Sequence, residues 1–246
     1  MLNFEVVGQG ATTKIYRDGI TAIKLYENAP PNEAENEADR QRFAINAGLP
    51  VPAVFAIRRL ENGNVALDME YVDGKPLIHQ GMNKIERKEA IGTLVELQCR
   101  VHQINASGLP KQSQWLSQRI KHSSFLSDED KNRLLTLLSE LDVGKENLCH
   151  GDFHPLNVLY DGEKHWIIDW VNATAGSPFA DACRTYLIFK QYMTRSAGIY
   201  LKAFCDKAKA KQEDILVWLP IVAAGRLHEN LDGKARAWLL EQIMFT

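Results

Sequence analysis

Three oxygen-bearing side chains stand at spacings that suit phosphoryl transfer. Asp152 and Asn157 both belong to the run HGDFHPLN at 150–157, and Asp169 ends the run WIID at 166–169. Phosphoryl transfer needs a carboxylate that orients the attacking hydroxyl and accepts its proton, and it needs oxygen ligands for the magnesium ions on the phosphates. We therefore predict that Asp152 is the catalytic residue and that Asn157 and Asp169 are the Mg²⁺ ligands.

The same residues carry a resemblance to a known family. A kinase catalytic loop reads H-R-D-x-x-x-x-N and is followed by an Asp-led metal motif, and this chain has H-G-D-x-x-x-x-N followed by D-W. The combination resembles the aminoglycoside phosphotransferase and choline kinase superfamily of small-molecule kinases, over about residues 4–192. Members of that superfamily carry a further Asp about twelve residues after the metal motif, and Asp181 matches it here.

The resemblance implies a fold and a reaction. We expect a two-lobed, protein-kinase-like α+β fold, in which residues 1–72 form a nucleotide-binding lobe with an antiparallel sheet and one helix. Residues 73–246 are expected to form a mostly helical lobe for catalysis and substrate binding. The implied cofactors are Mg²⁺ and ATP, with GTP as an open alternative. The implied acceptor is a hydroxyl of a small polar molecule, such as an amino sugar, an aminoglycoside-like compound, a choline-like compound or a sugar.

The resemblance also selects a lysine and a glutamate for the nucleotide. Lys24 ends the strand-like run AIK at 22–24 and corresponds to the lysine that contacts the α and β phosphates. A helix carboxylate should orient it, and the family spacing selects Glu37. Glu33 lies one helical turn earlier and remains the alternative.

Two further segments are expected to contact the nucleotide. Gly8 and Gly10 belong to the run GQGATT at 8–13, and glycines let a backbone approach phosphate oxygens closely. That run is a weak signal alone, and an ordinary hairpin turn is the alternative. The run MEYV at 69–72 resembles the hinge, so the carbonyl of Glu70 and the amide of Val72 are expected to pair with adenine.

The elements that must position these residues follow from periodicity and turn residues. Strands are expected at 4–7, 14–17, 21–26, 54–59 and 65–70, with a hairpin turn at Asp18-Gly19. One helix should run from about 33 to 47, because glutamates occupy its first turn and Gly48 and Pro50 follow its end. Later helices are expected at 85–104, at 128–141 after Ser127, and from 179 onwards, with a short hairpin at 158–168.

Composition narrows the function classes. The chain has 246 residues and a net charge of −2, without a long basic run, which argues against a nucleic-acid or membrane surface. Four widely spaced cysteines form no C-x-x-C pair, so a reduced, cytoplasmic protein is expected. The first ten residues do not resemble a signal peptide, and the most apolar late run, at 215–225, is too short to span a bilayer. The oligomeric state stays open.

Several alternatives remain at this point. An atypical protein kinase is one, although Gly151 stands where regulated protein kinases have Arg and no A-P-E run follows. A nucleotide-binding module without catalysis is another, and a zinc hydrolase using His150, Asp152 and His154 is a third. The acceptor site is the least determined feature. The late charged residues are either surface charges or an anionic pocket for an amine-bearing acceptor: Glu213, Asp214, His228, Glu229 and Asp232.

Overall fold

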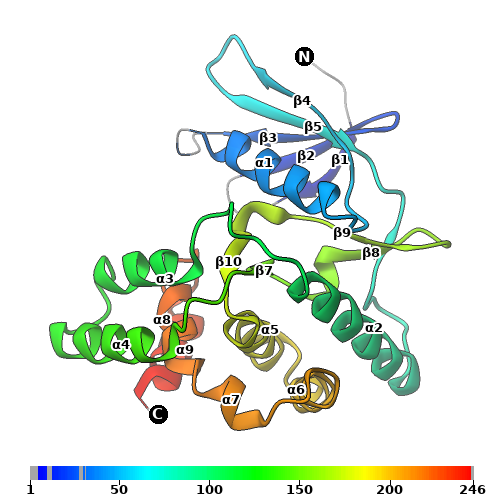
Figure 1. Cartoon of the computed structure of the whole chain (residues 1–246). Coiled ribbons are helices and arrows are strands. Elements are labelled where there is room, and N and C mark those ends of the chain that lie inside the picture. Colours follow the sequence, from blue (N-terminus) through cyan, green and yellow to red (C-terminus); the bar gives the residue numbers. More distant parts are fainter. Residues whose placement is uncertain (1–4, 10–12, 28–29, 31, 245–246) are drawn as a thin grey trace. The chain divides into compact units, whose positions relative to one another are not determined.

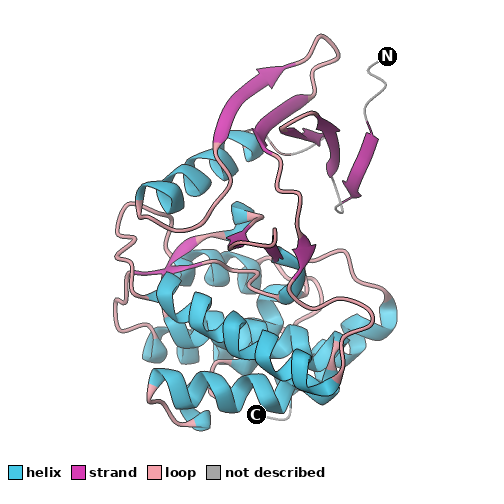
Figure 2. Cartoon of the chain, turned by 90° about the vertical axis from the view of Figure 1, so that its right-hand side faces the viewer, coloured by secondary structure: helices cyan, strands magenta, loops and turns pink. Residues whose placement is uncertain are grey.

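A computed structural model describes residues 5–9, 13–27, 30 and 32–244 of the chain. The chain divides into two compact units (Figure 1). The first unit contains Met1–His79 and Pro155–Asn172, and the second contains Gln80–His154 and Ala173–Thr246. Strands predominate in the first unit and helices in the second (Figure 2).

The first unit is built on a five-stranded antiparallel sheet with the order β1-β2-β3-β5-β4. Its strands are β1 (Glu5–Gln9), β2 (Thr13–Asp18), β3 (Thr21–Tyr26), β4 (Val54–Arg59) and β5 (Val65–Glu70). The unit adds helix α1 (Glu33–Asn46) and a small sheet of β6 (Lys75–Pro76), β8 (Val158–Tyr160) and β9 (His165–Ile167). Two 3₁₀ turns complete it, η1 (Pro155–Asn157) and η2 (Trp170–Asn172).

The predicted turn and helix end in this unit are confirmed. Asp18 pairs with Thr21 across the β2–β3 hairpin, and Gly19 has φ 58°, a left-handed conformation that glycine adopts without strain. Helix α1 is capped at Ala47, and Gly48 has φ 76°. The helix packs on the sheet because small apolar residues recur on one of its faces. Buried side chains form that core: Tyr26, Ala34, Ala38 and Leu67.

The second unit consists mainly of helices. They are α2 (Lys84–His102), α3 (Gln112–Lys121), α4 (Asp128–Leu141), α5 (Pro178–Tyr192), α6 (Thr194–Ala208), α7 (Gln212–Leu216), α8 (Leu219–Arg226) and α9 (Gly233–Met244). A short antiparallel ladder joins β7 (Asn147–Cys149) to β10 (Thr174–Gly176). Within the described residues, no helix is both long enough and apolar enough to cross a bilayer.

Capping residues explain where the long helices begin. Asn83 accepts hydrogen bonds from the Ile85 and Glu86 amides, and the Glu86 side chain accepts one from the Asn83 amide, which completes a capping box for α2. The predicted Ser127 cap is confirmed, since its hydroxyl accepts from the Asp130 amide. Helix α3 was not predicted, because its sequence QSQWLSQRIK has few apolar positions, and only its buried face shows helical spacing.

The β7–β10 ladder leaves no room for a side chain at Gly176. A Cβ atom there would lie 2.8 Å from Cδ of Gln112, whose Oε1 accepts a hydrogen bond from the Ser177 amide. Gln112 is 8% exposed, so its side chain has little space to withdraw from a new Cβ atom. The start of α5 therefore depends on glycine at this position.

We predict that Gly176→Ala destabilises the protein by about 1–3 kcal/mol, the usual cost of overpacking. The matched control is Gly198→Ala within α6, where a new Cβ meets nothing within 4 Å and helix propensity favours alanine. Urea unfolding of both variants measures the difference. Equal midpoints for the two would contradict the steric reading.

Candidate active site

In the first unit, one buried lysine joins two carboxylates. Lys24 Nζ lies 2.8 Å and 2.9 Å from the two carboxylate oxygens of Glu37, and 2.9 Å from Oδ1 of Asp169. The Lys24 side chain is 9% exposed and that of Glu37 1%, whereas that of Asp169 is 36% exposed. The lysine therefore holds one carboxylate inside the unit and another at an accessible position.

Each partner is placed by a different element. Lys24 lies on β3, opposite Leu67 on β5 and Ile15 on β2, at the centre of the sheet. Glu37 lies on the face of α1 that packs against the sheet and reaches Lys24. Glu33 lies one turn nearer the start of the same helix, so the position of α1 along the sheet selects Glu37. The Tyr26 hydroxyl donates a further hydrogen bond to Glu37 and fixes its carboxylate.

The electrostatics of this cluster favour a charged lysine. Burial lowers the pKa of Lys24, but the charges of Glu37 and Asp169 and their hydrogen bonds outweigh it and raise that pKa above the ordinary value. Lys24 is thus a fixed cation at neutral pH. A fixed cation beside an accessible carboxylate suits the binding of nucleotide phosphates through magnesium.

The backbone brings the two predicted metal ligands into one segment. Asn157 ends η1, and its carbonyl accepts a hydrogen bond of 3.0 Å from the Ile168 amide, next to Asp169. Val158 pairs with Ile167 in the β8–β9 hairpin, so the residues just outside the hairpin must approach each other. Asp169 has φ 65°, and such a conformation at a non-glycine residue is a mark of functional sites.

These two side chains have the chemistry of a magnesium site. One carboxylate and one amide supply oxygen ligands, and magnesium normally completes its shell with water and phosphate oxygens. Within the described ranges, no group of three His, Cys, Asp or Glu residues is arranged to hold a metal ion, so the set that zinc prefers is not assembled there. The role of Asn157 and Asp169 stays a prediction.

The structure describes some, but not all, of the other residues predicted to bind the nucleotide. Gly8 lies on β1 at an irregularity in its pairing with β2, while Gly10 lies outside the described residues. Glu70 ends β5, and its side chain accepts a hydrogen bond of 3.1 Å from the Ala53 amide. Val72 follows two residues later. The adenine contacts expected of Glu70 and Val72 stay predictions.

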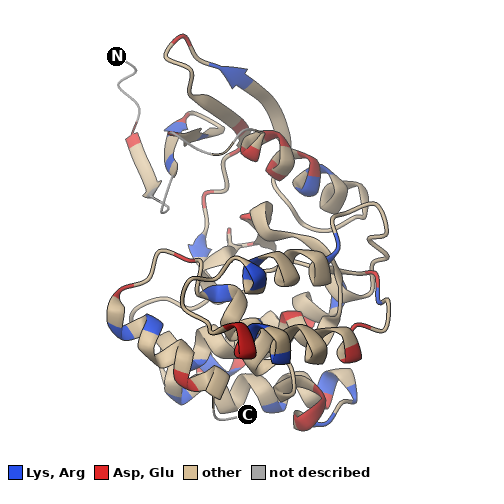
Figure 3. Ribbon diagram, turned by 90° about the vertical axis from the view of Figure 1, so that its left-hand side faces the viewer, with Lys and Arg blue, Asp and Glu red and all other residues tan. Residues whose placement is uncertain are grey.

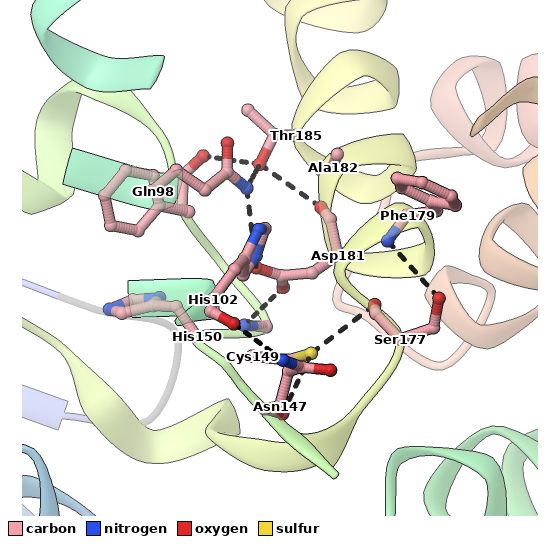
Figure 4. A network of polar contacts seen from close by, with 12 residues as sticks. Gln98, His102, Asn147, Cys149, His150, Ser177, Phe179, Asp181, Ala182 and Thr185 are labelled. Atoms are coloured by element: carbon pink, nitrogen blue, oxygen red, sulfur yellow. Dashed lines mark hydrogen bonds and ion pairs between the residues drawn. The ribbon is translucent and has the colours of Figure 1, made fainter. Parts of the chain in front are cut away.

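The second unit holds the catalytic loop through a buried aspartate. Asp181 is 1% exposed, and its carboxylate accepts hydrogen bonds of 2.8 Å from the Gly151 amide and 2.8 Å from His102 Nε2 (Figure 4). Gly151 has φ 78°, which explains the glycine that stands where protein kinases have Arg. Asp181 therefore braces the loop at Gly151 and ties it to His102 on α2.

Asp152 itself lies between two nitrogen donors. Its carboxylate is 3.3 Å from Arg184 Nη2 and 3.4 Å from His154 Nε2, and its side chain is 24% exposed. Burial raises the pKa of Asp152, but the His154 hydrogen bond and the Arg184 charge outweigh it, so that pKa lies well below its ordinary value. Asp152 is consequently ionised at neutral pH and fixed in orientation.

Sequence reasoning missed the cationic partner of Asp152. Arg184 lies on α5 one turn after Asp181, and it joins Asp152 to Glu229, whose Oε1 is 2.8 Å from its Nη1. Glu229 also receives two hydrogen bonds from Arg226. The only sequence signal for this partner is the spacing of Arg184 from Asp181, because residues i and i+3 share a helix face.

Comparison with known proteins identifies the family. The model of the phosphotransferase enzyme family, APH, matches residues 4–213, so the chain belongs to this family. A mouse protein (Mus musculus) named acyl-CoA dehydrogenase family member 10 is 28% identical over 200 residues. That match covers 72% of this chain but 18% of the mouse protein, so the chain spans under a fifth of that relative's length.

Solved structures share the fold. A thermostable mutant of aminoglycoside phosphotransferase APH(4)-Ia, in ternary complex with ADP and hygromycin B, has a TM-score of 0.73 at 16% identity, over 98% of this chain and 92% of that one. The GDP complex of wild-type aminoglycoside 2'-phosphotransferase-IIIa has a TM-score of 0.65 at 16% identity, over 97% and 90%. The predicted kinase-like α+β fold is confirmed, and family membership places the chain among phosphotransferase enzymes.

We predict that Lys24→Ala lowers kcat/KM for ATP hydrolysis by about 10²–10³-fold, as expected when a charge-stabilising group is lost. Glu37→Gln should act in the same direction but more weakly, because it misorients the lysine without removing its charge. The double variant should be less than additive, since the two side chains touch. Glu33→Gln is the control, and a larger loss in that variant than in Glu37→Gln would contradict the assignment.

We predict that Arg184→Gln moves the acid limb of the ATP hydrolysis profile to higher pH. Removal of the positive charge raises the pKa of Asp152, so a larger fraction is protonated at a given acidic pH and activity is lost earlier on acidification. Arg184→Lys should shift the limb less. Arg195→Gln removes an exposed charge from the same unit and serves as the control. A profile of Arg184→Gln that matches this control would exclude the coupling.

Proposed function

We propose that the chain transfers the γ-phosphoryl group of ATP to a hydroxyl of a small polar molecule. The observation that carries this proposal is the pairing of Lys24 with both Glu37 and Asp169 in one unit. In the reaction, a bond forms between the acceptor oxygen and the γ-phosphorus, and the bond to the ADP oxygen breaks. The acceptor loses its proton late, as in a loose transition state.

The first unit supplies the groups for the nucleotide. Lys24 contributes a fixed positive charge for the α and β phosphates, and Glu37 keeps it in position. Asn157 and Asp169 would hold magnesium, which when bound neutralises charge on the phosphate oxygens. Gly8 and Gly10 are assigned to the phosphates, and Glu70 and Val72 to adenine.

The second unit supplies the group for the acceptor. Asp152 is ionised and has an accessible carboxylate, so it can accept a hydrogen bond from the attacking hydroxyl and direct the oxygen toward phosphorus. Arg184 and His154 fix that carboxylate. A hydroxyl held in this way reacts faster chiefly because its orientation is fixed before the reaction.

The choice of ATP rests on the hinge resemblance, and GTP remains the alternative to be tested. The solved relatives include complexes with ADP and with GDP, which supports a purine nucleotide without selecting one. The same assay with either triphosphate decides between them. Failure to release a nucleoside diphosphate from both would favour the non-catalytic module.

We predict that Asp152→Asn retains nucleotide binding and loses turnover by about 10²–10⁴-fold, the usual contribution of an orienting or general-base group. Asp169→Ala should lose magnesium-dependent nucleotide binding as well. The measurements are ADP release and MgATP titration calorimetry. Asp206→Asn is the control, because its exposed carboxylate pairs with Lys202 on α6. Wild-type kcat in Asp152→Asn would remove this residue from the mechanism.

A further inference from the structure

We propose that the phosphate acceptor carries an anionic group, a carboxylate or a phosphate, recognised by the guanidinium groups beside Asp152. The inference rests on the proposed function and names the chemical class of its acceptor. It replaces the amine-bearing acceptor that the late acidic residues suggested. All groups that carry it belong to the second unit.

The charges around Asp152 do not balance. Arg184 pairs with Asp152 and Glu229, and Arg226 pairs with Glu229. Arg119 Nη1 donates a hydrogen bond of 3.2 Å to the Gly225 carbonyl, next to Arg226. We call Arg119, Arg184 and Arg226 the arginine cluster. The arginine cluster thus carries three positive charges against the two carboxylates of Asp152 and Glu229. Burial together with the charge of Arg184 lowers the pKa of Arg119. An additional anion would complete this set.

Hydrogen bonding within the arginine cluster is also incomplete. The side chains of Arg184 and Arg226 are 10% and 3% exposed. Nε of Arg184 and Nη1 of Arg226 are buried and have no hydrogen-bond partner among the described residues. Buried donors without partners are uncommon and costly in native proteins. A small anion is the ligand that satisfies two guanidinium groups at once, since their planar forks match carboxylate and phosphate.

A groove in the second unit reaches one member of the arginine cluster, Arg119. It has a volume of about 1000 Å³ and lies along α3 and α4, and Arg119 is part of its lining. Its other charged lining residues are Lys111, Lys121 and Asp142. Glu146 lies 4.0 Å from Lys111, so three cations face at most two carboxylates there. Figure 3 shows the Lys and Arg residues of α3 in blue, and that helix has no acidic residue.

Three of the four late acidic residues that might bind an amine have other partners. Glu229 is neutralised by two arginines. Asp214 accepts a hydrogen bond from the Lys211 amide at the start of α7, and Asp232 accepts one from the Ala235 amide at the start of α9. Carboxylates in such positions cap helices and are not free to bind a substrate cation. A cationic acceptor would therefore meet repulsion from the arginine cluster.

Sulfate tests the site without depending on acceptor shape. It is titrated calorimetrically into protein saturated with MgADP, so that the nucleotide phosphates are already in place. We expect wild-type protein to bind sulfate and Arg119→Gln to bind it about tenfold to a hundredfold more weakly, the effect of losing a hydrogen bond to a charged group. Arg119→Lys should recover part of the affinity. Absence of binding to wild type, or equal loss in the exposed control Lys202→Gln, overturns the proposal.

Matched acceptors test the chemical class. Two series of compounds differ mainly in the charge of one end: glycerate, glycerol and aminopropanediol, and gluconate, sorbitol and glucamine. Glycerol phosphate is added to separate recognition of phosphate from recognition of carboxylate. ADP release should be highest for the anion in a series that reacts, and Arg119→Gln should raise its KM more than it lowers kcat. Preference for a neutral or cationic member overturns the inference but leaves the phosphotransferase function intact. If the wild-type protein shows no ATP turnover with any acceptor and no basal hydrolysis, the proposed function is overturned instead.

Discussion

The first unit depends on neutralising one buried charge. An ammonium group that is 9% exposed is costly unless carboxylates surround it. Lys24 meets this requirement with Glu37 from α1 and Asp169 from the segment after β9. The sheet, the helix and the β8–β9 hairpin must therefore all form before the lysine is satisfied. The arrangement that stabilises the unit is also the one that we propose binds a nucleotide with magnesium.

The second unit uses buried charge in a similar way. Asp181 accepts hydrogen bonds from His102 and the Gly151 amide and so fixes the catalytic loop to α2 and α5. Arg184, one turn later on α5, fixes the Asp152 carboxylate and continues to Glu229. One helix thus supplies both the anion that shapes the loop backbone and the cation that directs its functional side chain. Helix α5 therefore determines both the position and the charge state of Asp152.

The charge around Asp152 bears on what the enzyme can accept. Family membership defines a phosphotransferase enzyme, but the solved relatives are below 20% identity and share only the fold with this chain. Acceptor preference depends on a few side chains, and the arginine cluster that reaches Asp152 through Arg184 is the basis of the proposed anionic acceptor. The same kinase-like scaffold can then serve acceptors of opposite charge, because the groups for the nucleotide and those for the acceptor lie on different elements.

The sequence alone determined the features that depend on local patterns. The strands at 13–26, the end of α1 at Gly48, the Ser127 cap and the double motif around Asp152 and Asp169 all follow from turn residues, capping residues and fixed spacing. Tertiary structure alone decided the choice of Glu37 over Glu33, because the two lie one turn apart on the same side of α1 and only the position of the helix along the sheet separates them. It also decided that Arg184 pairs with Asp152 and that Arg226 pairs with Glu229. Partners far apart in the chain meet only through packing, and no local spacing encodes the balance of charge that results.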